Sequence, residues 1–528
     1  MLQGLGLGRD GMSAINRIAL IEAGSPGLNI YSHVAMGRGI PLLATVVRAA
    51  GYDVRAFIED VSGRDSVDWE FVAGCDVVGF SAITCTMPRT AELVARTRVL
   101  NPGATILFGG PEPTCDPARS FEAGADMVLR GEAELTLPRL LAVLGGEPAG
   151  SLGDIEGLLW REEGAVREGL PMRQLTRTEL DALPLVDRSL VHHAEDASVA
   201  AVWRTRGCPS HCDFCEVCEI YPRCVHRSDD RTLDELMEAQ RNGYDTAFLI
   251  DDNAAANKPA FMEFLRKAAS GGYAQALVTQ LRADSIFGKD GKIDREFLKL
   301  LKRAAAVTVV CVGVESASDE DLAAVHKNVD AKRMGRALRA MKRTGILVHG
   351  MFIALTDDTR EALMRNGDYA RKYVTSLQYL FETPLPGTKR TAEHEAAGTM
   401  LFRTLEDLSL YDGMHCVLEP LKMHASEMQQ LVLREYRRFY SKRRIVAAAL
   451  QGTFVRFRRL SQGQRAMLRD LPVWRRAGAW LRMHASYKYA PVAFLTVGYK
   501  RVQVVLNDPD YAAFLRRLES IGPRRQEA

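Results

Sequence analysis

Cys208-Pro-Ser-His-Cys212-Asp-Phe-Cys215 is the stretch of this 528-residue chain that decides its fold. Gaps of three and two residues place all three cysteines on one short loop. Three thiolates on a loop hold three irons of a [4Fe–4S] cube and leave the fourth iron open to another ligand. Structural zinc is the competing interpretation, but it prefers paired C-x2-C units that are a dozen or more residues apart. The spacing therefore favours an iron–sulfur cluster with one open iron.

The other seven cysteines are less informative. Cys218 and Cys224 follow the triplet closely, and each is an inert small side chain, an alternative metal ligand or a thiol near a substrate. The remaining five are scattered singly, which does not resemble a disulfide framework. Because an oxygen-sensitive cluster also favours a reducing compartment, we expect a cytoplasmic protein.

Length and composition are typical of a large globular enzyme of two or three domains, with 47% hydrophobic and 26% charged residues. No apolar run is long enough to cross a bilayer, and Met1–Asp10 lacks the layout of a signal peptide. The net charge of +3 conceals an asymmetry. Leu431–Ala528 contains 21 Lys and Arg but 6 Asp and Glu, a net charge of +15, which leaves −12 for residues 1–430.

Residues 1–145 alternate between short apolar runs and segments with helical spacing. The expected strands are Arg17–Ala23, Asp53–Ile58, Val77–Ser81, Thr105–Phe108 and Met127–Leu129. The expected helices are Gly39–Ala50, Arg89–Leu100 and Leu135–Leu144. This alternation predicts an α/β domain with a doubly wound, flavodoxin-like parallel sheet. Ligands of such sheets bind beyond the carboxyl ends of the strands, where small residues let a bulky, flat ligand approach the backbone.

A connector, residues 146–198, leads to a second alternating region, residues 199–388. In the connector, the apolar patch around Gly157–Trp160 predicts a β-ribbon and a linker rather than another core. The expected strands of the second region are Ala200–Arg204, Phe248–Ile250, Ala276–Thr279, Val307–Val314, Val348–Ile353 and Ser376–Leu380. The helices between them include Lys258–Ala269, Arg295–Arg303, Asp330–Arg343 and Arg360–Lys372. Six such units predict a partial TIM-type barrel, whose active residues gather at the strand carboxyl ends.

Together with its lead-in Arg206-Gly207 and with Phe214, the triplet resembles the radical S-adenosylmethionine (SAM) superfamily. The resemblance implies a (β/α)6 barrel, a [4Fe–4S] cluster on Cys208, Cys212 and Cys215, and SAM at the open iron. The residues it implies for SAM binding are Phe214, Asp251, Asp252, Asn253, Arg282 and Glu315. Structural alternatives are N-capping of the next helix by Asp251 or Asp252, and a buried ion pair of Glu315.

Residues 1–145 resemble the cobalamin-binding domain that precedes many radical SAM domains, with Gly109-Gly110-Pro111 and Arg130-Gly131-Glu132 at the expected places. The resemblance implies cobalamin as a cofactor, bound by Ser81, Thr84, Gly109, Gly110, Gly131 and Glu132. The D-x-H-x-x-G motif that supplies a histidine to cobalt is broken around His33, so we expect no histidine ligand. A domain that has lost its cofactor, or binds a substrate instead, is the alternative.

The pattern from about Arg17 to Tyr440, including Ser409–His415, resembles cobalamin-domain radical SAM proteins. The family contains methyltransferases of unactivated carbon, among them hopanoid-lipid methylases, and an anaerobic porphyrin-ring cyclase. The resemblance implies reductive cleavage of SAM to a 5′-deoxyadenosyl radical and cobalamin-dependent methylation of an unactivated carbon. The alternatives are an oxidative cyclase or rearrangement enzyme, and a tRNA methylthiotransferase-like enzyme, which the lack of a second cysteine trio disfavours. No catalytic acid or base is assigned.

Residues 389–528 are expected to form a mainly helical, basic extension. Ser426–Ser441 and Ile445–Leu460 alternate apolar and basic positions at helical spacing. Such a surface is either solvated or binds anionic lipid, with Trp474, Trp480, Tyr487 and Tyr489 at headgroup depth. Nucleic acid is disfavoured because no recognisable RNA-binding module accompanies the charge. The expected partners are a small hydrophobic substrate such as a lipid or tetrapyrrole, a reductant such as flavodoxin or ferredoxin, and the inner membrane surface.

Overall fold

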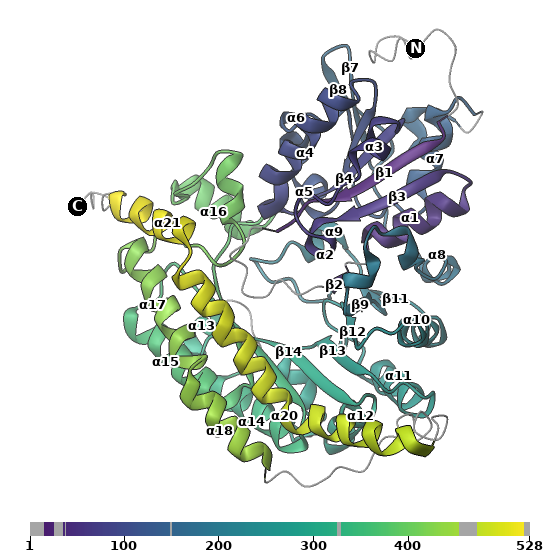
Figure 1. Ribbon diagram of the computed structural model, residues 1–528. Helices are drawn as coiled ribbons and strands as arrows, with labels where there is room; N and C mark the ends of the chain where they lie inside the picture. Colours follow the sequence, from purple (N-terminus) through teal and green to yellow (C-terminus); the bar gives the residue numbers. More distant parts are fainter. Residues whose placement is uncertain are drawn as a thin grey trace.

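The computed structural model describes residues 15–25, 35–36, 39–147, 150–324, 329–453 and 473–521. Two sheets, each covered by helices, lie one above the other, and a helical extension runs along one flank of the lower sheet (Figure 1). The prediction of an α/β fold with a doubly wound sheet and a partial barrel is confirmed.

The first sheet has five parallel strands in the order β3-β1-β4-β5-β6, followed by the antiparallel hairpin β7-β8. Its strands are β1 (Arg17–Glu22), β3 (Asp53–Ile58), β4 (Val77–Ser81), β5 (Thr105–Gly109), β6 (Met127–Leu129), β7 (Leu158–Glu162) and β8 (Ala165–Glu168). The β-ribbon expected around Gly157–Trp160 is present as the hairpin β7-β8, but it is not a separate element. Leu158 and Leu159 pair with β6 and are buried, so the hairpin extends the first sheet.

Short helices cover both faces and the carboxyl edge of this sheet. They are α1 (Gly39–Ala49), α2 (Glu59–Ser62), α3 (Trp69–Ala73), η2 (Thr84–Thr86), α4 (Met87–Leu100), α5 (Pro111–Cys115), α6 (Pro117–Glu122) and α7 (Thr136–Leu144). The connector adds η3 (Leu152–Asp154), α8 (Arg177–Ala182), η4 (Arg188–Leu190) and η5 (Ala194–Asp196). Because helices cover both faces, the central strands are continuous apolar runs, which made them visible in the sequence.

The second sheet is all parallel, in the order β16-β15-β14-β13-β12-β9-β2. Its strands are β9 (Val199–Val202), β12 (Thr246–Leu249), β13 (Ala276–Gln280), β14 (Val307–Glu315), β15 (Leu347–Ala354), β16 (Ser376–Phe381) and β2 (Ala35–Met36). The helices outside it are α10 (Asp229–Arg241), α11 (Lys258–Ser270), α12 (Arg295–Arg303), α13 (Asp319–Ala324), α14 (Ala331–Thr344) and α15 (Arg360–Tyr373), with η6 (Ala283–Ile286). β2 lies in the chain between β1 and α1 of the first unit, but it pairs with β9 of the second sheet. A strand from the first unit is therefore hydrogen-bonded into the second sheet.

The extension after the barrel consists of α16 (Lys389–Ala397), η7 (Glu406–Leu410), α17 (Ala425–Phe439), α18 (Lys442–Thr453), α20 (Val473–Leu506) and α21 (Pro509–Ser520). α17 covers the edge strand β16. The hydroxyl of Tyr436 accepts from Tyr379 N (2.6 Å) and donates to Tyr379 O, and Tyr440 does the same at Leu377. Two tyrosines thus satisfy the edge of the open barrel as a further strand would.

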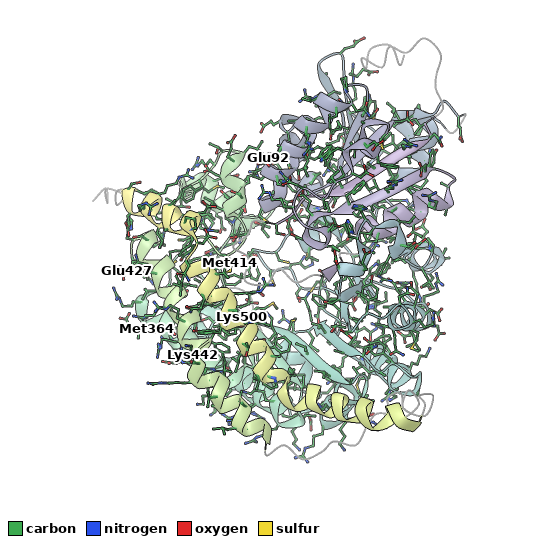
Figure 2. All side chains as sticks on the ribbon, in the orientation of Figure 1. Glu92, Met364, Met414, Glu427, Lys442 and Lys500 are labelled. Atoms are coloured by element: carbon green, nitrogen blue, oxygen red, sulfur yellow. The ribbon has the colours of Figure 1, made fainter. Side chains whose placement is uncertain are left out.

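Part of the expected basic extension lies outside the described residues. The second expected helix, Ile445–Leu460, is described as far as Thr453, and the side chains of Trp474, Trp480, Tyr487 and Tyr489 are not described. Figure 2 shows Lys442 on α18 and Lys500 on α20, and the Lys442 ammonium lies 5.9 Å from the ring centre of Tyr499. Among the described residues, no helix is long and apolar enough to span a bilayer.

Candidate active site

The cysteine loop projects from the carboxyl end of β9 and is closed at its base by two short strands. β10 (Thr205–Arg206) pairs with β11 (Val225–His226), and α9 (Val217–Ile220) lies within the loop. Gly207 has φ +83°, and a Cβ there would collide with the carbonyl oxygen of Arg223. The residue before Cys208 must therefore be glycine, which gives the Arg-Gly lead-in a steric reason.

Two neighbouring aspartates after β12 hold this loop. Asp251 is fully buried, and its Oδ1 accepts from Arg204 N (2.6 Å) and Thr205 N (3.0 Å). Asp252 Oδ2 accepts from Gly207 N (2.9 Å), and burial raises the pKa of Asp252 to about 6. Neither caps the next helix, because the N-cap of α11 is Asn257. Asp251 thus faces the loop backbone, whereas Asp252 also lines the adjoining cavity.

The three cysteines of the triplet are partly exposed, and none of them forms a disulfide with another described residue. Cys215 N donates to Cys212 O (3.0 Å), which forms the turn between them, and burial raises the pKa of Cys215 to about 12. Within the described residues, no three His, Cys, Asp or Glu side chains converge as they would around a single ion. A cube does not require such convergence, since each thiolate binds a different iron. A three-thiol set on a loop of this shape fits a [4Fe–4S] cluster.

Cys218 and Cys224 lie beside the triplet. The thiol of Cys218 is 3.5 Å from Ser210 O and 3.8 Å from Cys208 O, inside the curve of the loop. Cys224 Sγ is 3.9 Å from His226 Nε2, at the base of the loop. Both thiols therefore contact other groups of the loop.

The remaining residues expected at SAM lie around the strand ends. Arg282 Nη1 donates to Ser210 Oγ (3.3 Å), which places its guanidinium beside the cysteine loop. Asn253 Oδ1 is buried without a hydrogen-bond partner among the described residues, and Phe214 is partly exposed. Glu315 ends β14 after a bulge with φ +60°, an unusual backbone conformation for a non-glycine residue.

A cavity of about 350 Å³ lies between the carboxyl edge of the first sheet and the cysteine loop. Five of the six residues expected to bind cobalamin line it: Ser81, Gly109, Gly110, Gly131 and Glu132. Thr84 does not, since its hydroxyl donates to Glu112 Oε2 (2.5 Å). Gly110 has φ +102°, and a Cβ there would lie 2.8 Å from Ala82 O, so the sheet edge stays bare. A glycine-rich, largely apolar edge fits one part of a large, flat cofactor such as cobalamin.

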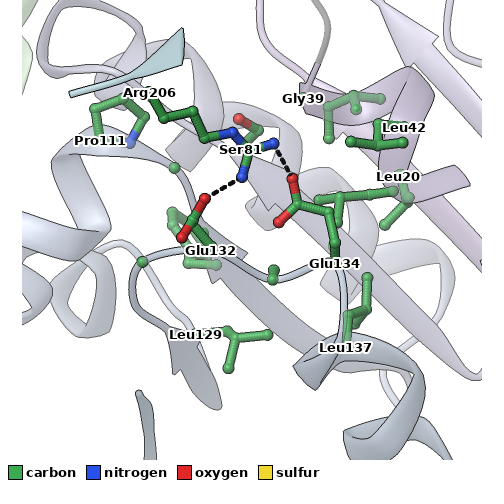
Figure 3. Close-up of a pocket in the computed structure, with 18 of the residues that line it drawn as sticks. Leu20, Gly39, Leu42, Ser81, Pro111, Leu129, Glu132, Glu134, Leu137 and Arg206 are labelled. Atoms are coloured by element: carbon green, nitrogen blue, oxygen red, sulfur yellow. Dashed lines mark hydrogen bonds and ion pairs between the residues drawn. The ribbon is translucent and has the colours of Figure 1, made fainter. Parts of the chain in front are cut away.

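The cavity also contains an ion cluster that sequence reasoning missed (Figure 3). Arg206, from the lead-in to the triplet, is buried and forms ion pairs with Glu132 and Glu134, which lie on the loop between β6 and α7. Glu132 Oε2 also accepts from Leu175 N (2.5 Å), and burial raises the pKa of Glu132 while Arg206 opposes that shift. The guanidinium carbon of Arg206 lies 4.1 Å from the ring centre of Trp203. In the sequence, Glu132 and Glu134 lie in Arg130-Gly-Glu-Ala-Glu134, and Arg206 lies two residues before Cys208. Only the fold shows that these three side chains are in contact.

His33 lies outside the described residues, so the expectation that it is no cobalt ligand stays a prediction. His349 contacts Ser376 Oγ (2.8 Å) and Gln378 Oε1 (3.4 Å), which agrees with a structural histidine.

Comparison with known proteins agrees with both halves of this arrangement. Residues 32–141 match the B12 binding domain, and residues 204–367 match the Radical SAM superfamily. An uncharacterized methyltransferase of Pyrococcus horikoshii is 25% identical over 77% of this chain and 88% of that protein. The hopanoid C-3 methylase of Methylococcus capsulatus is 25% identical over 82% of each chain. The anaerobic magnesium-protoporphyrin IX monomethyl ester cyclase of Cereibacter sphaeroides is 23% identical over 81% of this chain and 71% of that protein.

A solved structure shares the whole architecture. The cobalamin-dependent S-adenosylmethionine radical enzyme OxsB superposes with a TM-score of 0.64 at 14% identity, over 96% of this chain and 84% of that chain. At this identity the likeness concerns the fold. The chain is therefore a radical SAM enzyme with a B12-binding domain. Its cofactors are a [4Fe–4S] cluster, SAM and cobalamin.

Proposed function

We propose that this enzyme cleaves SAM reductively to a 5′-deoxyadenosyl radical and methylates an unactivated carbon of a small hydrophobic substrate. The observation that carries the proposal is the shared cavity. Gly109 and Gly110 of the first sheet, and Thr205 and Asp252 beside the cysteine loop, line one space. A methyl carrier on the first sheet and a radical source on the loop would thus face the same volume, which the transfer requires.

The chain's own residues hold and orient the groups. Cys208, Cys212 and Cys215 would hold the cluster, and Asp252 and Gly207 shape its loop. Arg282, beside this loop, would pair with the carboxylate of SAM. When bound, these cofactors supply the radical and the methyl group. Apolar walls that include Leu20, Phe80 and Trp203 exclude water, which would otherwise quench the reaction.

The substrate class follows from the relatives and from the lining. One curated relative is named as a hopanoid methylase and another as a porphyrin-ester cyclase, so both act on small molecules that are largely hydrophobic. A polycyclic lipid or a tetrapyrrole is the corresponding substrate here. The cyclase relative supports a second candidate, an oxidative cyclisation without methyl transfer.

Two partners complete the proposal. Reductive cleavage needs one electron from a carrier such as flavodoxin or ferredoxin. A peripheral contact with an anionic membrane would bring the enzyme to an apolar substrate, and α18 and α20 expose apolar side chains among basic ones.

Anaerobic reconstitution tests the function. The protein is loaded with iron, sulfide and cobalamin, then mixed with SAM that carries a deuterated methyl group and with dithionite. We expect 5′-deoxyadenosine and, with the correct lipid or tetrapyrrole, a product heavier by one labelled methyl group. Loss of hydrogen without the label would instead favour the cyclase. A cluster-loaded protein that forms no 5′-deoxyadenosine would contradict both.

A further inference from the structure

Two neighbouring barrel helices carry a concentrated positive charge. α12 and α14 together contain ten Lys and Arg and one acidic residue, Glu296. Glu296 is already paired with Arg266 (2.7 Å), on the side of α11. Residues 1–430 as a whole carry a net charge of −12. The positive charge of this face is therefore local and does not reflect a general excess of basic residues in this part of the chain.

The charged side chains surround a groove of about 470 Å³ between the two helices. Five of its lining residues are basic: Arg295, Lys299, Arg336, Arg339 and Arg343. All five are exposed, and within the described part of the chain none of them forms an ion pair. No acidic residue lines the groove. An unneutralised, concave cationic surface attracts an acidic partner and raises its rate of encounter.

This groove is joined to the cysteine loop by a short piece of structure. Arg333 and Arg336 lie over the ring of Phe287, with guanidinium carbons 4.4 Å and 5.7 Å from the ring centre. Phe287 directly follows the four-residue turn η6, which begins after Arg282. A 3₁₀ turn of this length spans about 8 Å. At its other end Arg282 donates to Ser210, which lies between Cys208 and Cys212.

The enzyme's own chemistry calls for a partner at such a place. Each reductive cleavage consumes one electron, and the sequence has no second C-x3-C-x2-C triplet that would store it. We propose that the groove between α12 and α14 is the docking surface for an acidic one-electron carrier protein of the flavodoxin class. The inference rests on the proposed function, because it names the donor for the same cluster. One electron passes from the carrier to the cluster, so the carrier is oxidised and the cluster reduced.

Charge reversal on the groove tests the proposal. Lys299→Glu with Arg336→Glu places one new acid on each helix, in full-length, cluster-loaded protein. Stopped-flow absorbance follows reduction of the cluster by a purified bacterial flavodoxin in its hydroquinone form. We expect the second-order rate constant at low salt to fall by about tenfold or more and its salt dependence to weaken. Reduction by dithionite, and 5′-deoxyadenosine formation with dithionite, should stay at the parental level.

The matched control is Lys422→Glu with Arg516→Glu, which makes the same change in net charge on exposed residues. Arg516 lies on α21, and Lys422 lies two residues before His424, which contacts Ile521 at the end of α21. An equal loss of rate in this control, or a parental rate in the groove variant, would overturn the docking site. So would loss of binding to RNA or to anionic vesicles without any change in the flavodoxin rate. A parent whose cluster dithionite cannot reduce would instead overturn the proposed function, and the docking site with it.

Discussion

Asp251 illustrates how a buried carboxylate serves a cofactor loop without facing the cofactor. Its Oδ1 accepts two backbone N–H groups at the point where β9 turns into the cysteine loop. Sequence reasoning placed Asp251, Asp252 and Asn253 correctly at the end of a barrel strand. It could not separate their roles, because these depend on which atoms of a loop some 45 residues earlier lie within reach. The same limit hid the pairing of Arg206 with Glu132 and Glu134.

The cysteine assignment makes the first prediction at this scale. Replacing Cys208, Cys212 and Cys215 together by Ala should abolish bound iron. It should also abolish the absorbance at about 400 nm that is typical of [4Fe–4S] clusters. Cys218→Ala is the matched control, since its thiol lies in the same loop yet outside the triplet. Iron analysis after anaerobic reconstitution measures both. About four irons in the triple variant would contradict the assignment.

Asp358 makes a second residue-scale prediction, about pH. It is buried between β15 and α15, and burial, with the neighbouring Asp321 and Asp357, raises its pKa to about 7, although Leu355 N donates to it (2.9 Å). An unfolded aspartate has a pKa near 3.9. The folded state therefore holds this proton more tightly, and the stability it contributes is lost as pH rises from about 4 to about 7.

Asp358→Asn should remove that loss. The stabilisation of the variant is its free energy of unfolding minus that of the parent at the same pH. We expect this difference to be roughly 1–2 kcal/mol larger at pH 8 than at pH 5.5. Urea unfolding of parent and variant at both pH values measures it. Asp196→Asn, at an exposed residue of η5, is a control for a general effect of removing one carboxylate. A gain that is the same at both pH values would show that Asp358 does not titrate in this range.

At the scale of elements, the sequence predicted the strands that helices cover on both faces. It did not predict which strands pair with each other. The expected Asp53–Ile58 and Val77–Ser81 agree with β3 and β4 to the residue, because buried parallel strands are continuous apolar runs between turns. β2 has two residues and no apolar run to detect. The hairpin β7-β8 was visible as a ribbon, but its pairing with β6 depends on a contact that local pattern does not encode.

The tyrosine cover of β16 is testable at this scale. Tyr436→Phe and Tyr440→Phe each leave a buried backbone N–H and C=O of the edge strand without their partner. Each unsatisfied group costs about 1–3 kcal/mol, so each variant should lower the free energy of unfolding in urea by at least that amount, and the midpoint should fall with it. Tyr499→Phe on α20 is the matched control, because the described structure shows no hydrogen bond from its hydroxyl. An unchanged midpoint in both edge variants would show that another group replaces the hydroxyls.

At the scale of the whole molecule, the Arg206 cluster joins the two sheets across the cavity. Removing one member leaves buried acids without a counter-charge, and breaking such a pair costs on the order of 3–5 kcal/mol. Arg206→Gln should therefore lose copurified cobalamin and bind less iron while its far-ultraviolet circular dichroism stays parental. Arg173→Gln, which breaks a half-exposed pair with Glu179 in the connector, is the control and should change little. Parental amounts of cobalamin and iron in the Arg206 variant would show that the ion pairs of Arg206 do not fix the position of one sheet relative to the other.

The basic extension consists of two parts that differ in how they contact the barrel. α17 belongs to the barrel, because Tyr436 and Tyr440 complete its edge, so deleting Leu431–Ala528 would remove a structural element along with the surface. α18 and α20 are different. Val446 and Leu450 are 57% and 59% exposed, and Val497 and Val504 are 46% and 60% exposed. Apolar side chains among basic ones are typical of helices that lie at a membrane surface.

Full-length protein with Val446→Asp and Leu450→Asp therefore tests the membrane contact without disturbing the fold. The parent should cosediment with anionic vesicles at low salt and release as salt rises, since each basic residue near such a surface contributes roughly 1 kcal/mol. The double variant should bind several-fold less, because it loses buried apolar area and adds two repelled charges. Val99→Asp with Leu100→Asp makes the same chemical change at exposed positions on α4 and should bind as the parent does. If the parent binds anionic vesicles no better than neutral ones, the extension is a solvated cap, and a substrate delivered through the aqueous phase becomes the consistent choice.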